Sequence, residues 1–227
     1  AQVIGSFTAA DYAFQMGYGY RLDSNFQVGA TLKLINSTYE SYNSWGIATD
    51  FAGVYQIPKS KFSMALILRN LGVQLSSFDG TKEKLPLQVD FGLSTKLQHV
   101  PLRLNLMFEN LQKMDLTYSD PNNVVKDPIT GDETIVKESV ANQILRHVVL
   151  GAEIAPSKKF NMQLGYAFRR GYEMSLPTRR STAGLTFGIG IKISKFRINY
   201  ANTNMNVAGR MHHFGITTSL DDFKSRK

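Results

Sequence analysis

Residues 85–110 read LPLQVDFGLSTKLQHVPLRLNLMFEN, and apolar and polar side chains alternate along both halves of this stretch. The apolar positions are Leu87, Val89, Phe91, Leu93 and Leu97 before a tight turn at residues 98–100, and Leu102, Leu104, Leu106 and Phe108 after it. A period of two predicts two β-strands, each with one apolar and one polar face. In a soluble sheet the apolar face packs on a core. In an outer-membrane barrel it meets lipid and the polar face lines the interior.

The same alternation recurs along the whole chain. We expect about eleven strands of roughly 9–14 residues, which is near or above the length that a tilted strand needs to cross a bilayer. Their first apolar positions are Tyr12, Phe26, Trp45, Phe62, Leu87, Leu102, Val148, Phe160, Leu185, Phe196 and Phe214. No run of about 18 apolar residues occurs, which argues against transmembrane helices.

The predicted connections alternate between short and long. The short ones lie at residues 23–25, 57–61, 98–100, 155–159 and 194–195, and the longer ones at 36–44, 76–86, 119–139, 176–182 and 204–210. Tight periplasmic turns that alternate with longer outside loops are typical of outer-membrane barrels.

Aromatic residues gather beside the short turns. Those that begin a strand are Phe26, Phe62, Phe160 and Phe196, and those that precede a turn on the same face are Tyr20 and Tyr55. Such a row indicates the aromatic girdle of a barrel at the level of the lipid headgroups. A soluble core gives no reason to collect aromatic residues at one end of its strands.

The polar face carries charges of both signs together with glycines. In a barrel interior these charges can pair, and the glycines let strands curve or let an internal plug come close. We predict a polar network on this face, structural rather than a substrate path: Arg21, Asp50, Arg69, Asp90, Arg103, Glu109, Glu153, Arg169, Lys192 and Arg197. The predicted fold is therefore an all-β, transmembrane antiparallel β-barrel, with a soluble β-sandwich or lipocalin-like barrel as the alternative.

Residues 1–220 are expected to form this barrel, and residues 221–227 a periplasmic C-terminal tail. Residues 1–14 lack the basic start and apolar core of a signal peptide. Bacterial barrels have an even number of strands and both ends in the periplasm. Counting back from the tail, we expect an odd number of strands to precede Ala1, and three would give about fourteen.

Composition excludes several classes of function. The chain has no cysteine, so disulfide scaffolds and cysteine metal sites are impossible. The net charge is +8, but the basic residues are scattered through strands and turns, which argues against a nucleic-acid partner. No motif for a nucleophile, a phosphate-binding loop or a zinc helix occurs. We therefore expect no enzymatic activity and no cofactor.

Three smaller features have a functional alternative. His212 and His213 could bind a metal, but adjacent strand residues point to opposite faces. Asp127, Asp132 and Glu133 resemble a loose calcium loop whose spacing does not fit an EF-hand, so a solvated loop is preferred. Arg179 and Arg180 lie in an outside loop. They are expected to be solvated, with extracellular contact to lipopolysaccharide phosphate or a partner protein as the alternative.

Longer segments resemble one family of proteins. They include GSFTAADYAF (5–14), LKLINSTYESYNSWGIATDF (32–51), LRNLGVQL (68–75), FENLQKMDLTYSDP (108–121), LRHVVLGAEIAPSKKFNMQLGYAFRR (145–170), FGIGIKISKFRINYA (187–201) and HHFGITTSL (212–220). Together these resemble the PorQ family, outer-membrane barrels of the type IX secretion system of Bacteroidota. The family is related to PorV and, distantly, to the FadL fatty-acid transporters.

The resemblance implies a FadL-like barrel of about fourteen strands in the outer membrane of a Gram-negative cell. It also implies a non-catalytic role: anchoring a cell-surface attachment complex with PorZ, PorU and PorV. That complex removes secretion signals from cargo proteins and links the cargo to lipopolysaccharide. Loops at 36–43, 76–84, 119–143, 175–182 and 204–210 are the expected docking surfaces. The alternatives are FadL-like transport of hydrophobic molecules and an open porin.

Overall fold

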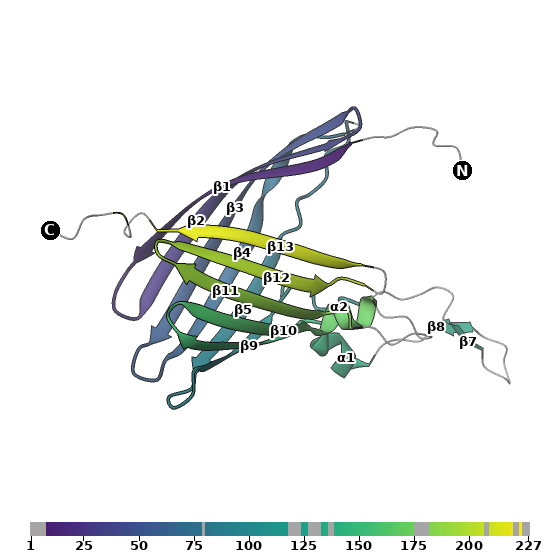
Figure 1. Ribbon diagram of the computed structural model, residues 1–227. Helices are drawn as coiled ribbons and strands as arrows, with labels where there is room; N and C mark the ends of the chain where they lie inside the picture. The colour runs from purple at the N-terminus through teal and green to yellow at the C-terminus, as the bar shows by residue number, and fades with distance from the viewer. Residues whose placement is uncertain are drawn as a thin grey trace, which may run out of the picture. The chain divides into compact units, whose positions relative to one another are not determined.

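The computed structural model describes residues 8–78, 80–117, 124–126, 133–135, 139–174, 182–206, 209–219 and 223. Eleven strands of these residues form one antiparallel sheet in the order β1-β2-β3-β4-β5-β6-β9-β10-β11-β12-β13 (Figure 1). Each strand therefore lies beside the one that precedes it in this sheet. The predicted all-β class with about eleven strands is confirmed.

The strands are β1 (Ala9–Arg21), β2 (Phe26–Tyr39), β3 (Tyr42–Ile57), β4 (Phe62–Ser76), β5 (Gln88–Lys96), β6 (Leu102–Phe108), β9 (Val148–Ser157), β10 (Phe160–Ala167), β11 (Leu185–Ile193), β12 (Phe196–Asn204) and β13 (Arg210–Thr218). A separate hairpin pairs β7 (Val124–Lys126) with β8 (Glu133–Ile135), and the two short helices are α1 (Val140–Leu145) and α2 (Phe168–Glu173). Among the described residues, no helix has both the length and the apolar character needed to cross a membrane.

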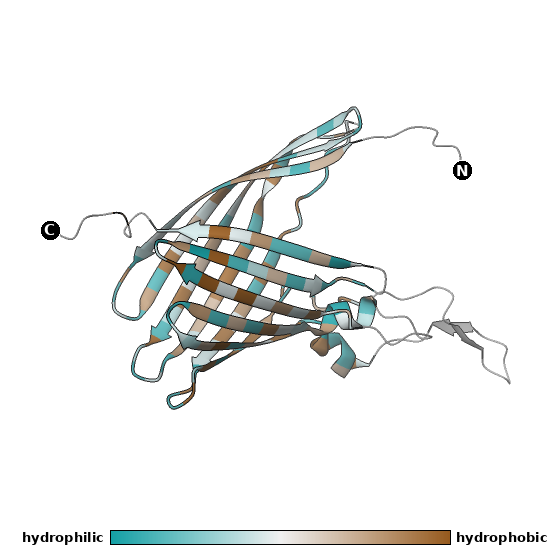
Figure 2. Ribbon diagram, in the orientation of Figure 1, coloured by the Kyte–Doolittle hydropathy of each residue, from teal (hydrophilic) through white to brown (hydrophobic). Residues whose placement is uncertain are grey.

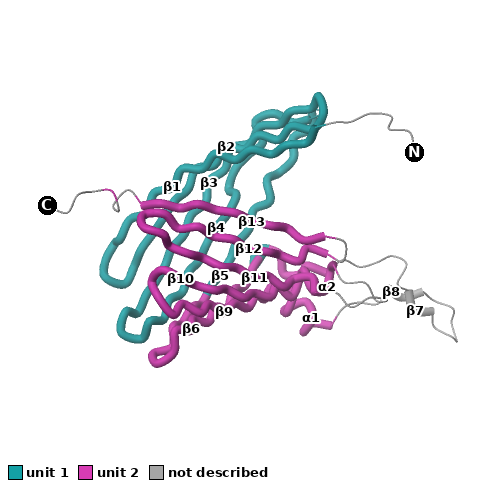
Figure 3. Tube along the Cα trace, viewed as in Figure 1, with its two compact units in different colours: residues 1–92, 110–112 teal, residues 93–109, 113–227 magenta. Residues whose placement is uncertain are grey.

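The chain divides into two compact units. Unit 1 holds residues 1–92 and 110–112, and unit 2 holds residues 93–109 and 113–227 (Figure 3). The boundary falls inside β5, so each unit is described by itself. The expected single barrel domain over residues 1–220 stays a prediction.

In unit 1, the connection between β2 and β3 is shorter than expected. Residues 36–44 were predicted as a loop, but β2 continues to Tyr39, which pairs with Tyr42 across a turn at Glu40 and Ser41. Polar side chains hold this end together, because the Asn36 Nδ2 donates to the Asn43 Oδ1 at 3.1 Å and the Asn43 Nδ2 to the Thr38 Oγ1 at 2.9 Å. The polar composition of residues 36–44 was therefore not sufficient to predict a loop.

In unit 2, the predicted irregular stretch at 119–139 contains the β7–β8 hairpin, and α1 follows it. The Ser139 side chain caps α1 by accepting from the Asn142 backbone N–H. The β9–β10 and β11–β12 connections are two residues long, at 158–159 and 194–195. As predicted, Phe160 and Phe196 are the first residues of their strands.

Exposure along the strands runs opposite to that of a soluble sheet. Val28, Leu32 and Leu66 in unit 1 are 40%, 51% and 56% exposed, whereas Gly29 and Thr31 between the first two are half-buried. Only three hydrophobic residues of the described chain are buried, namely Ala48, Leu116 and Ala183. Figure 2 shows hydrophobic and hydrophilic residues alternating along the strands. On β2 the apolar face is therefore the more exposed one, whereas nearly all of β1 and all of β13 are exposed on both faces.

Candidate functional site

Two groups of charged and amide side chains occupy the polar face, one in each unit. The Asp90 cluster of unit 1 comprises the side chains of Lys33, Asp50, Arg69, Asn70, Gln88 and Asp90, together with the backbone N–H of Asn110. The Glu153 cluster of unit 2 comprises Arg103, Glu153, Asn161 and Arg197. Alternation along the strands places both on the face opposite the exposed apolar side chains.

Asp90 on β5 is the most deeply buried charged residue of the described chain, at 1% exposure. Its Oδ2 accepts from the Arg69 Nε at 2.9 Å. Its Oδ1 accepts from the Gln88 Nε2 at 2.8 Å and from the Asn110 backbone N–H at 3.2 Å. Three donors, one of them charged, thus offset the cost of burying this carboxylate.

A β-bulge positions Asp50 and Asn70, which with Lys33 form the second half of the Asp90 cluster. Thr49 pairs with Leu71 and Phe51 with Leu68, so Arg69 and Asn70 together oppose Asp50. Asn70 has a positive φ of 58°, a conformation that asparagine tolerates better than most residues. The bulge aims the Asn70 backbone N–H at the Asp50 Oδ1, at 2.9 Å.

Lys33 on β2 completes this half. Its Nζ lies 2.6 Å from the Asp50 Oδ2 and donates to the Asn70 Oδ1 at 3.0 Å. The Lys33 and Asp50 side chains are only 13% and 14% exposed. Every carboxylate oxygen of Asp50 and Asp90 therefore has a donor. These contacts join β2, β3, β4 and β5 on the polar face.

The Glu153 cluster connects four strands of unit 2, β6, β9, β10 and β12. The Arg103 Nη1 lies 3.8 Å from the Glu153 Oε2, and the Asn161 Nδ2 donates to the Glu153 Oε1 at 3.0 Å. Arg197 donates to the Asn161 Oδ1 at 3.3 Å and to the Lys158 carbonyl oxygen at 3.4 Å. Gly190 leaves room for this row, because a Cβ there would collide with the Asn161 Oδ1.

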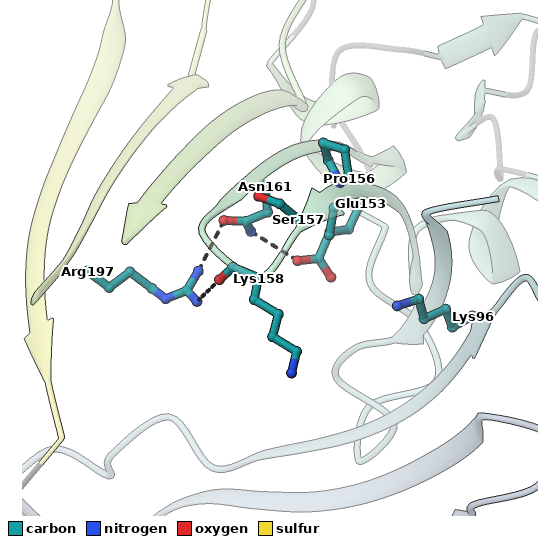
Figure 4. Close-up of a pocket in the computed structure, with 8 residues that line it drawn as sticks. Lys96, Glu153, Pro156, Ser157, Lys158, Asn161 and Arg197 are labelled. Carbon is teal, nitrogen blue, oxygen red and sulfur yellow. Dashed lines mark hydrogen bonds between the residues drawn. The ribbon is translucent and has the colours of Figure 1, made fainter. Parts of the chain in front are cut away.

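The row borders a cavity of about 340 Å³ (Figure 4). Its lining residues are Lys96, Glu153, Ala155, Pro156, Ser157, Lys158, Asn161 and Arg197. Figure 4 shows Arg197, Asn161 and Glu153 linked in sequence, with the Lys158 side chain extending into the space between Arg197 and Lys96.

The remaining residues of the predicted polar network lie elsewhere. Arg169 was expected on the polar face of a strand, but β10 ends at Ala167 and Arg169 lies in α2, where its Nε is 2.9 Å from the Glu173 Oε1. Arg21 is exposed at the last position of β1, and Glu109 follows the end of β6. Lys192 lies directly across from Arg197 in the β11–β12 pair.

The smaller predicted features are placed only in part. His212 contacts Tyr200, whose hydroxyl lies 2.9 Å from the His212 Nδ1, and His213 pairs with Ala201. No group of three or more potential metal-binding side chains occurs among the described residues. Arg179, Arg180, Asp127 and Asp132 lie outside the described residues, as do most of the expected docking loops at 119–143 and 175–182.

Sequence reasoning missed the uncharged members of both clusters, Asn70, Gln88, Asn110 and Asn161. Gln88 shares the polar alternation of Asp90 two positions earlier, so a search for amides on the charged face would have found it. Asn70 carried no such signal, because the bulge that aims it depends on the pairing of β3 with β4.

A comparison of the chain with models of known families, with curated proteins and with solved structures finds no match.

Proposed function

We propose that the chain forms the membrane-spanning part of a β-barrel in the outer membrane. The observation that carries the proposal is the inverted burial, since exposed apolar side chains cover one face while a paired carboxylate, Asp90, is 1% exposed on the other. A Leu, Ile or Phe side chain left in water forgoes roughly 1.5–3 kcal/mol relative to burial. Lipid against the apolar face removes that cost, and the strand alternation is the one expected for such a barrel.

A fourteen-stranded FadL-like barrel is the closed form that we favour. Among the strands that the structure describes, β1 and β13 each pair with one neighbour. An unpaired strand edge cannot face hydrocarbon, because its backbone groups would lack partners. Closure of the sheet into a barrel would satisfy those groups, and the resemblance to the PorQ family supports fourteen as the strand number.

Within this setting we propose a non-catalytic scaffold role in type IX secretion, with PorZ, PorU and PorV as partners at the cell surface. The resemblance to the PorQ family supports the assignment. The Asp90 cluster agrees with it, since its carboxylate oxygens are all engaged by donors from neighbouring segments.

FadL-like transport of hydrophobic molecules is the second candidate, and one observation favours it. A cavity of about 390 Å³ in unit 1 is lined by Tyr39, Tyr42, Gln74, Phe78, Thr81 and Glu83. The Tyr39 and Phe78 rings meet edge to face at 5.4 Å. Aromatic walls of this kind suit an apolar ligand.

Paired cysteine substitutions test the membrane proposal, because the chain contains no cysteine. Val28→Cys and Gln27→Cys probe the two faces of β2, and Leu104→Cys and Asn105→Cys those of β6. In lipid vesicles we expect an environment-sensitive fluorophore to report an apolar environment at residues 28 and 104 and an aqueous environment at residues 27 and 105. Equal polarity at the members of each pair would overturn the proposal.

The two candidate roles are separated by what accompanies the protein from its native membrane. Cross-linking followed by purification should recover a PorZ-like surface protein if the chain is a scaffold. Co-purified fatty acid with no such protein would support transport instead, and sustained ion conductance in planar bilayers would indicate an open porin.

A further inference from the structure

The cavity beside the Glu153 cluster has an excess of positive charge. Three cations line it, Lys96, Lys158 and Arg197, against the single carboxylate of Glu153, which gives a formal charge of +2. Glu153 is also engaged from outside the cavity, since Arg103 lies 3.8 Å away. The positive charge is therefore not balanced within the cavity wall.

The two lysines supply donors that no described residue uses. Neither the Lys96 nor the Lys158 ammonium group forms a hydrogen bond or ion pair within the part of the chain that the structure describes. Arg197, in contrast, is held in place by Asn161, which is itself 8% exposed, and by the Lys158 carbonyl oxygen. A fixed guanidinium with two adaptable ammonium groups is a favourable combination for an oxyanion.

We propose that this cavity binds a phosphate monoester. The charge decides between oxyanions: a phosphate monoester carries about −1.5 to −2 at pH 7 and matches the excess, whereas a carboxylate or sulfonate carries −1 and leaves one cation unbalanced. A volume of about 340 Å³ accommodates the phosphate with a small organic group. All lining residues belong to unit 2.

Titration of the detergent-purified full chain with methyl phosphate, followed by calorimetry, tests the proposal. Methanesulfonate is the singly charged counterpart of similar size. We expect methyl phosphate to bind at least about tenfold more tightly, and its affinity to rise between pH 5 and pH 7.5 as the second proton leaves near pH 6. Equal affinity for the two anions would overturn the proposal.

Lysine variants locate the site. Lys158→Gln and Lys96→Gln should each weaken methyl phosphate binding about tenfold, the effect of losing one charged hydrogen bond. Lys159→Gln is the matched control, because Lys159 is the next residue of the same turn and does not line the cavity. An equal loss from Lys159→Gln would show that only general positive charge matters and would refute the site.

The source of the phosphate is separated by competition. Phosphatidic acid in mixed micelles should displace methyl phosphate if the natural ligand is a lipid headgroup, and should leave binding unchanged if it is a soluble ester. Displacement and unchanged binding both require that methyl phosphate binds in the cavity. Absence of methyl phosphate binding at millimolar concentration by a chain with native circular dichroism would end the proposal without affecting the cysteine test of membrane insertion.

Discussion

At the scale of single residues, Asp90 is the side chain whose loss should matter most. In Asp90→Asn, the new amide nitrogen is a hydrogen-bond donor. It would lie against another donor, either the Arg69 Nε or the Gln88 Nε2. We expect the free energy of unfolding to fall by about 2–3 kcal/mol. The midpoint of urea unfolding in lipid vesicles measures this change.

Arg103→Ala is the matched comparison for Asp90→Asn. The Arg103–Glu153 pair is long, at 3.8 Å, and the Arg103 side chain is 50% exposed. Solvent screening should limit its loss to less than about 1 kcal/mol. An equal loss of unfolding free energy in the two variants would contradict the view that burial and the number of donors decide how much each charged group contributes to stability.

Asp23 in the β1–β2 turn gives a prediction about pH. Its Oδ1 accepts from the Asn25 backbone N–H at 2.7 Å and from the Phe26 N–H at 2.8 Å. These bonds, that of Asn25 foremost, hold the pKa of Asp23 below its ordinary value. Because the folded pKa is lowered, the turn gains stability above the unfolded pKa and loses it as pH falls through the folded one.

We therefore expect Asp23→Ala to destabilise the protein at neutral pH and to match the parent chain once the pH lies below the folded pKa. Unfolding midpoints measured across that range check this. A difference that persists unchanged in acid would show that the carboxylate charge is not responsible.

At the scale of elements, the pairing of β3 with β4 depends on a close approach. A Cβ on Gly72 would collide with the Ile47 carbonyl oxygen and lie 2.6 Å from the Ala48 Cα. Since backbone cannot yield as a side chain can, Gly72→Ala should cost about 1–3 kcal/mol of stability. Gly53→Ala, on β3 with nothing within 4 Å of its Cβ, should leave the unfolding midpoint unchanged.

The strands were predictable from sequence because alternation is a local property. Phe26, Phe62, Phe160 and Phe196 begin their strands as expected, since each follows a recognisable turn. The end of β10 was not predictable, because Phe168 and Arg169 continue the alternation yet lie in α2. Nor was the bulge at Asn70, which is set by the partner strand. Charged members of the clusters, and Gln88 beside them, could thus be proposed from the alternation, whereas Asn70 could not, because its place depends on the bulge between β3 and β4.

At the scale of the whole molecule, the membrane proposal makes a spectroscopic prediction. Trp45 is the chain's single tryptophan, and it is 42% exposed on the apolar face of β3, three residues from the start of the strand. In vesicles of brominated phosphatidylcholine its emission should be quenched, more by bromine near the headgroups than by bromine near the chain ends, because tryptophan favours the membrane interface.

Two neighbouring residues provide the control for this measurement. In a Trp45→Phe background, Phe26→Trp places the indole on the apolar face at the start of β2, and Gln27→Trp places it one residue further on the opposite face. Brominated lipid should quench the emission of Phe26→Trp and leave that of Gln27→Trp unchanged, since adjacent strand residues point to opposite sides. If brominated lipid quenched both equally, or neither while the chain remained folded, the apolar face would not be meeting lipid. The exposed rows at Phe26, Leu32 and Leu66 would then require a protein partner to cover them.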